Sequence, residues 1–92
     1  MSKVILEGYI VIPKAEKAEV LQALDEHIAL TRAESGCLVF DIRPDQMDEC
    51  VYHVYEEFVD KAAFESHQAR VRASDWRRAS ANVARHYKPL RN

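Results

Sequence analysis

The chain has 92 residues, of which 48% are hydrophobic and 30% are charged, a composition typical of one globular domain spanning residues 1–92. Its formal net charge of -2 gives no general attraction to phosphate backbones, so we expect no nucleic-acid partner. Near the N-terminus a charged residue, Glu7, follows only a few apolar residues, which predicts neither a signal peptide nor a membrane-spanning segment. We therefore expect a cytoplasmic protein with no membrane partner.

The first part of the chain predicts a strand followed by a helix. Residues 3–12 carry apolar side chains on both faces of an extended segment, and Pro13 ends the strand. Residues 14–32 predict a helix, because suitable core side chains recur every three or four positions. Gly36 in the following turn predicts a residue with positive φ. The core positions of the helix are Val20, Leu21, Leu24, Ile28 and Thr31.

The rest of the chain predicts a hairpin, two helices and a last strand. Asp60 is the expected N-cap of the first of these helices, and Ser74 or Asp75 caps the second. This element order is that of a ferredoxin-like βαββαβ domain of the α+β class, with the helices on one face of an antiparallel sheet. The expected bounds are 37–43 and 50–58 for the hairpin strands, 44–49 for their loop, 60–72 and 75–84 for the helices, and 85–90 for the last strand.

One face of the predicted sheet has no helix to cover it. Ile5, Tyr9 and Val11 belong to that face, and an exposed apolar patch usually marks a partner surface. A domain of this length buries only about 60 to 65% of its unfolded surface, so a second copy would add to its stability. We therefore expect a homodimer packed sheet on sheet.

The two cysteines are predicted to be free thiols. If the strands at 37–43 and 50–58 pair as a hairpin, Cys37 and Cys50 lie about 20 Å apart at roughly 3.3 Å per residue. That distance is too long for a disulfide, and free thiols are typical of a reducing compartment.

The best candidate for chemistry is His67, one helical turn after Phe64 on the predicted helix at 60–72. An imidazole with a pKa of about 6.5 can accept a proton from a phenol or an enolisable ketone at neutral pH. The alternative interpretation is a half-buried histidine bonded to a carbonyl or carboxylate.

Glu56 is the second candidate catalytic residue. It shares one strand face with Tyr52 and Phe58, whereas Tyr55 lies on the other face. A buried Glu56 with a raised pKa could act as a general acid or base. The alternative is an ion pair with a cation such as Arg43 or Arg78.

We expect a pocket for a planar aromatic molecule between the sheet and the helix at 60–72. Near Trp76, the arginines at 72, 77 and 78 could bind an anionic ligand or stack on the indole, or could simply lie in water while the indole anchors the helix. The expected pocket residues are Tyr52 or Tyr55, Phe58, Phe64, His67 and Trp76.

No metal or organic cofactor is expected. The four histidines have no short ligand spacing, and there is no Cys-x-x-Cys or His-Glu-x-x-His motif. With Gly8 and Gly36 as the only glycines, the chain also lacks a glycine-rich phosphate loop and a nicotinamide or flavin fingerprint.

Three short motifs resemble the antibiotic biosynthesis monooxygenase family. Residues 34–38 read Glu-Ser-Gly-Cys-Leu, residues 55–58 read Tyr-Glu-Glu-Phe, and Phe64 precedes His67 in a Phe-x-x-His pattern. The resemblance implies a dimeric α+β barrel and the cofactor-independent oxidation of a quinol or polyphenol by dioxygen, with His67 as proton acceptor. It also implies a substrate contact for Arg78, where phenol-oxidising relatives place an arginine.

The chain departs from the family pattern at several positions. Arg72 stands where members often carry a second histidine, and Val54 and Phe58 replace an asparagine and a tryptophan of phenol-oxidising members. The asparagine and histidine of haem-degrading members are absent at Glu7-Gly8 and Trp76-Arg77, so haem degradation is not expected.

Three hypotheses follow for the function. The first is a cofactor-free monooxygenase whose partners are a small aromatic substrate and dioxygen. The second is an isomerase or tautomerase of a small hydroxy-ketone, with or without a phosphate, because an acid and a base suffice for that reaction. The third is a non-catalytic module that binds a hydrophobic ligand, since a fold does not fix a function.

Overall fold

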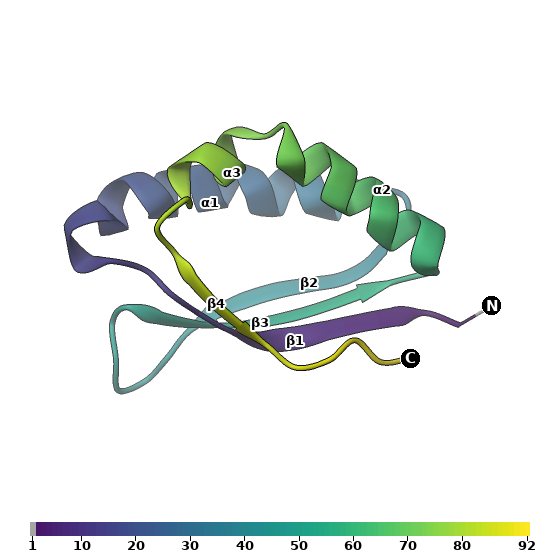
Figure 1. Ribbon diagram of the computed structural model, residues 1–92, viewed down its shortest axis with the longest axis horizontal. Helices are drawn as coiled ribbons and strands as arrows, with labels where there is room; N and C mark the ends of the chain where they lie inside the picture. The colour runs from purple at the N-terminus through teal and green to yellow at the C-terminus, as the bar shows by residue number, and fades with distance from the viewer. Residues whose placement is uncertain (1) are drawn as a thin grey trace.

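The computed structural model describes residues 2–92, and in it three helices cover one face of a four-stranded antiparallel sheet (Figure 1). The strands lie in the order β2-β3-β1-β4, which confirms the predicted ferredoxin-like α+β fold; the sheet is not closed into a barrel. The elements are β1 (Val4–Val11), the 3-10 turn η1 (Lys14–Glu16), α1 (Lys17–Arg32), β2 (Cys37–Pro44), β3 (Val51–Phe58), α2 (Lys61–Arg72), α3 (Asp75–Ala79) and β4 (Ala84–Tyr87).

The predicted bounds differ from the structure mainly in the last third of the chain. The helix expected over 75–84 ends at Ala79, where the Ser80 hydroxyl donates to the Trp76 carbonyl and a turn follows. The strand expected over 85–90 is β4, which pairs with β1 only from Gly8 to Val11. Pro89 has no N–H for a longer ladder, although the chain returns to β1 through an Ile5–Arg91 bridge.

The core lies between the sheet and the helices. β1 and β3 present Ile10, Val54 and Phe58 to this layer, and all three are buried. Along α1 the buried side chains are three or four residues apart, as the helical period requires, but they include a histidine where Ile28 was expected. The buried positions of α1 are Val20, Leu24, His27 and Thr31.

Gly36 has a different role from the predicted one, because neither glycine has a positive φ. A Cβ built on Gly36 would lie 2.4 Å from the Cβ of Ala63 on α2. Glycine at this position therefore allows the turn before β2 to approach α2 closely.

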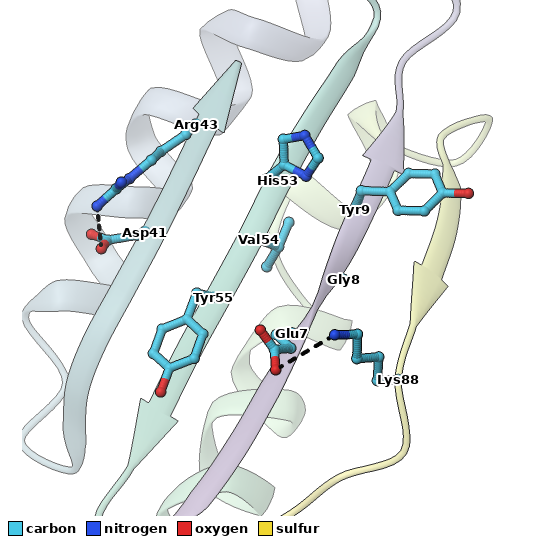
Figure 2. Close-up of a pocket in the computed structure, with 9 residues that line it drawn as sticks. All are labelled: Glu7, Gly8, Tyr9, Asp41, Arg43, His53, Val54, Tyr55 and Lys88. Carbon is cyan, nitrogen blue, oxygen red and sulfur yellow. Dashed lines mark hydrogen bonds and ion pairs between the residues drawn. The ribbon is translucent and has the colours of Figure 1, made fainter. Parts of the chain in front are cut away.

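The open face of the sheet is more polar than the sequence predicted. Figure 2 shows Tyr9, His53 and Tyr55 together with charged side chains around a hollow of about 460 Å³. Ile5 is already buried within one chain, and Tyr9 stacks on His86 with ring centroids 4.7 Å apart. The uncovered apolar surface is therefore smaller than the alternation of β1 alone suggested. The charged residues at the hollow are Glu7, Asp41, Arg43 and Lys88.

Cys37 and Cys50 are free cysteines in this structure. Cys37 starts β2 opposite Phe58, and Cys50 lies just before β3, near the other end of the hairpin. In the part of the chain that the structure describes, no helix has the length and apolar character needed to cross a membrane.

Candidate active site

A cavity of about 440 Å³ lies on the helix-covered side of the sheet, below α2 and α3. Four elements contribute side chains that can do chemistry to its lining. They are His27 of α1, Glu56 of β3, His67 of α2 and Tyr87 of β4.

The start of α2 fixes the position of His67. Asp60 caps the helix by accepting a hydrogen bond of 2.8 Å from the Ala63 amide. Phe64 and His67 then lie one turn apart on the side that faces the sheet, and both are buried. His67 is only 6% exposed, and its ring bonds the carboxylate of Glu34, the kind of partner that the alternative interpretation predicted.

The Glu34 carboxylate holds the His67 ring. Nδ1 of His67 lies 3.0 and 3.2 Å from the two carboxylate oxygens. Because a carboxylate only accepts hydrogen bonds, Nδ1 carries the proton and Nε2 keeps its lone pair. Burial lowers the pKa of His67, while the charge and hydrogen bond of Glu34 oppose that shift. His67 is therefore a neutral base at neutral pH.

Glu34 is itself held by α2. Arg70 Nε donates to Glu34 Oε2 at 2.6 Å, and Arg70 Nη2 donates to the Thr31 hydroxyl at 2.9 Å. These bonds tie the turn after α1 to the helix that carries His67. In the sequence, Glu34 stands out only as the first residue of the Glu-Ser-Gly-Cys-Leu motif, which was the available signal for its role.

Glu56 faces Nε2 of His67 at 3.9 Å from its Oε1. The residue is 5% exposed, and no hydrogen-bond partner for Oε1 exists among residues 2–92. Burial, with a further contribution from the charge of Glu34, raises the pKa of Glu56 to about 8. Glu56 is therefore mainly a neutral carboxylic acid at pH 7. Its expected alternative, an ion pair with Arg43 or Arg78, is not formed, because those side chains bind Asp41 and Asp75.

His27 was missed by the sequence analysis. Its ring stacks on Trp76 with centroids 5.0 Å apart and an angle of 9°, and lies 5.9 Å from the His67 ring. Burial is the main cause that lowers the pKa of His27 to about 3, with smaller contributions from His67 and Arg70. His27 thus stays neutral. Its spacing of three residues from Leu24 and four from Thr31 could have predicted that His27 lies on the buried face of the helix.

Tyr87 is the second missed residue. β4 pairs Tyr87 with Gly8, where a Cβ would lie 2.9 Å from the Tyr87 ring, so glycine leaves room for this ring beside β1. Burial of the hydroxyl, and then the proximity of Glu56, raise the pKa of Tyr87 to about 12 against the opposing effect of Arg85. Tyr87 therefore remains a hydroxyl donor. The alternation of side chains along the strand at residues 84–87 could have indicated which face of the sheet Tyr87 occupies.

No group of three or more His, Cys, Asp or Glu side chains within residues 2–92 is arranged to hold a metal ion.

A sequence comparison decides the family, because the antibiotic biosynthesis monooxygenase family matches residues 3–79. The chain belongs to this family. No functionally curated protein matches it.

Solved structures share the fold of this family member. The Pseudomonas aeruginosa protein PA3566 is 26% identical with a TM-score of 0.75, covering 99% of this chain and 91% of its own. A Nitrosomonas europaea protein, provisionally named an antibiotic biosynthesis monooxygenase, is 18% identical with a TM-score of 0.81 and coverages of 99% and 97%. A Deinococcus radiodurans protein of the same provisional name is 23% identical, with a TM-score of 0.80 and coverages of 97% and 90%.

The structure brings half of the predicted site residues to the cavity. His67, Glu56, Phe64 and Trp76 line it. Phe58 lies directly behind, fully buried, with its ring centroid 4.8 Å from that of His67.

The other three predicted residues lie elsewhere. Tyr52 packs against the core cluster that contains Trp76. Tyr55 is on the open face (Figure 2), because strand alternation turns it away from Glu56. Its hydroxyl donates to Glu57. Arg78 points to Asp75 on the exposed side of α3, while Arg72 and Arg77 line the cavity.

Proposed function

We propose that the protein is a cofactor-independent monooxygenase that oxidises a quinol or polyphenol with dioxygen. The observation that carries the proposal is the arrangement at His67, whose Nδ1 is held by Glu34 while Nε2 faces the neutral acid Glu56 at 3.9 Å. Membership of the antibiotic biosynthesis monooxygenase family supports the reaction class.

The first step is proton removal. Nε2 of His67 accepts the proton of a substrate hydroxyl and produces an electron-rich phenolate. The imidazolium that forms is stabilised by the carboxylate of Glu34, which already accepts a hydrogen bond from Nδ1.

The second step uses the electrons of the substrate. The phenolate passes an electron to dioxygen, and the resulting radicals combine to form a C–O bond at a ring carbon that carries hydrogen. As the O–O bond breaks, the C–H proton moves to the departing oxygen, which leaves a carbonyl and releases hydroxide. The hydroxide takes a proton from Glu56 to become water, and the proton held by His67 then restores Glu56. For a hydroquinone the balance is one quinol plus one dioxygen giving one hydroxyquinone plus one water.

The walls of the cavity support a planar substrate. Phe64 and Trp76 supply apolar aromatic surface, and a volume of about 440 Å³ lies within the usual range for small-molecule sites. The stack of His27 on Trp76 holds the indole in place.

Oxygen uptake with menadiol tests the proposal. Spontaneous oxidation of menadiol yields menadione and hydrogen peroxide, whereas monooxygenation yields the hydroxyquinone and water, so added catalase separates the two. We expect enzyme-dependent formation of hydroxyquinone that is lost in His67→Asn and retained in the control Glu26→Gln, on the exposed side of α1. Identical product mixtures with and without the protein would refute the proposal for this quinol class.

A second candidate function is an isomerase or tautomerase of a hydroxy-ketone. The observation that favours it is the same pair, because a base and a neutral acid 3.9 Å apart can move a proton along a substrate without oxygen. Solvent deuterium appearing in the ketone under anaerobic conditions, with no effect of dioxygen on the rate, would select this candidate over the monooxygenase.

The proposal includes a cytoplasmic homodimer. Free Cys37 and Cys50 are compatible with a reducing compartment. The dimer would use the open face of the sheet, where Tyr9 and His53 lie beside charged side chains able to pair across a two-fold axis (Figure 2).

A further inference from the structure

The arginines of this chain fall into two groups. Five of the eight make ion pairs with carboxylates: Arg32, Arg43, Arg70, Arg78 and Arg91. Within residues 2–92, the remaining three form no ion pair, and all three line the cavity that contains His67. These three, Arg72, Arg77 and Arg85, are called the cavity arginines below.

The acids at this cavity do not balance the cavity arginines. The only carboxyl group in the lining is Glu56, which is mainly uncharged at pH 7 because burial raises its pKa to about 8. His27 and His67 are neutral there as well. The cavity thus carries three positive charges, whereas the whole chain has a formal net charge of -2. A positive site on an acidic protein attracts anions selectively.

The three guanidinium groups come from different elements. Arg72 ends α2, Arg77 belongs to α3, and Arg85 belongs to β4. Arg85 donates to the carbonyls of Ser80 and Val83, neutral groups that leave its charge uncompensated. Arg72 and Arg77 are exposed, so they lie at the rim of the cavity rather than in its floor.

Stacking on the indole does not account for these arginines. The partner that stacks on Trp76 is His27, at 5.0 Å and nearly parallel. Ion pairing within α3 does not account for Arg77 either, because Asp75 of that short helix is paired with Arg78.

We propose that the substrate of this cavity is a planar aromatic molecule carrying an anionic oxygen group, a carboxylate or a phosphate, which the cavity arginines bind at the rim. This inference rests on the proposed function and adds the class of its substrate. Guanidinium groups bind such oxygens through charge-assisted and often bidentate hydrogen bonds. With the anion at the rim, the aromatic ring extends inward between Phe64 and Trp76 toward His67.

Binding of three matched naphthalenes to the intact protein tests the inference. 2-Naphthoate and 2-naphthyl phosphate are anions, and 2-naphthamide is a neutral analogue of the first with nearly the same shape. We expect at least one anion to bind about tenfold more tightly than the amide, a difference of about 1.4 kcal/mol, with the advantage shrinking as salt is added. The anion that binds more tightly shows whether the site prefers a carboxylate or a phosphate. Equal dissociation constants for all three would overturn the inference.

A matched pair of variants assigns the effect to the rim. In the double variant Arg72→Gln with Arg77→Gln, the preference for the anion should fall well below that of the native protein, because only the charge of Arg85 remains, while 2-naphthamide binding is unchanged. Arg78→Gln removes the same charge from an arginine outside the cavity and should keep the preference. Arg85 is left in place because it also bonds the turn between α3 and β4. An equal loss in Arg78→Gln, or an undiminished preference in the double variant, would contradict the assignment.

These probes lack an oxidisable hydroxyl, so their binding is measured without turnover. If menadiol is oxidised but the anions have no advantage, the proposed function stands and this inference fails. If the anions bind preferentially but no quinol is oxidised, the anion site stands and the monooxygenase proposal fails.

Discussion

Nε2 of His67 and Oε1 of Glu56 face each other 3.9 Å apart, each buried, one without its proton and the other with it at neutral pH. The proton distribution follows from burial, because both side chains avoid the charged form in this environment. Burial lowers the pKa of the base and raises the pKa of the acid, so an uncharged base and an uncharged acid face each other, which is the arrangement that proton-transfer catalysis requires.

Activity should follow a bell-shaped pH profile. Below its lowered pKa, His67 becomes protonated and can no longer accept the substrate proton. Above pH 8, Glu56 loses the proton that it has to donate, since its pKa is about 8. In Glu56→Gln the alkaline limb should disappear along with most of the turnover. An alkaline limb near pH 8 that persists in Glu56→Gln would show that another group titrates there.

Glu56 should also make stability depend on pH. Its pKa is raised in the folded state, so its contribution to stability is fully present below the ordinary value of 4.5 and is lost as pH rises through about 8. Glu56→Gln removes this loss. Urea titrations of both proteins at pH 5 and pH 9 should therefore give a free energy of unfolding that falls between the two values only in the native sequence. Parallel changes in both proteins would contradict a buried neutral Glu56.

His27 should limit stability in acid. Its folded-state pKa, about 3, is depressed below the ordinary 6.5, so the unfolded chain binds a proton first and stability falls as pH drops through this window. His27→Phe keeps an aromatic ring against Trp76 and cannot take that proton. We expect the variant to lose less of its melting temperature than the native protein between pH 7 and pH 4. His86→Phe, at an exposed histidine, serves as the control.

Glu34→Gln should lower turnover by about tenfold or more, because the amide is a weaker partner for the imidazolium formed in the reaction. The pH profile separates this role from a structural one. Glu34 raises the pKa of His67, so its removal should move the acid limb to lower pH. Glu26→Gln, on the exposed side of α1, should move neither quantity. An unchanged acid limb in Glu34→Gln would argue that Glu34 only tethers α1 to α2.

The sequence predicted the order of elements because each has a clear period or cap, as in the alternation of β3 and the Asp60 N-cap of α2. The same local patterns placed Glu56 and Tyr55 on opposite faces of β3 but left open which of the two faces meets the helix that carries His67. Local sequence patterns could not predict contacts between segments that lie far apart along the chain. Glu34 reaches His67 across 33 positions of the chain, and Tyr87 enters the site only because β4 pairs with β1 at Gly8.

The open face should form the dimer interface. Tyr9→Asp would place a charge without a partner in that interface, so it should both dissociate and destabilise the protein. Sedimentation at micromolar concentration should give about twice 10.6 kDa for the native chain and about 10.6 kDa for the variant. Leu30→Asp, at an exposed apolar residue of α1, should stay dimeric. A native chain that sediments as a monomer would refute the homodimer.

The most direct test of the central claim, that His67 is the base of an oxygen-inserting reaction, is oxidation of menadiol under ¹⁸O₂. Because His67 is buried, His67→Asn is the suitable variant; its amide can still donate to Glu34 but cannot take a proton. The account predicts one ¹⁸O atom in the hydroxyquinone formed by the native protein, the other in water, and no labelled hydroxyquinone from a folded His67→Asn variant. An unlabelled product, or equal labelling by the folded variant, would contradict it.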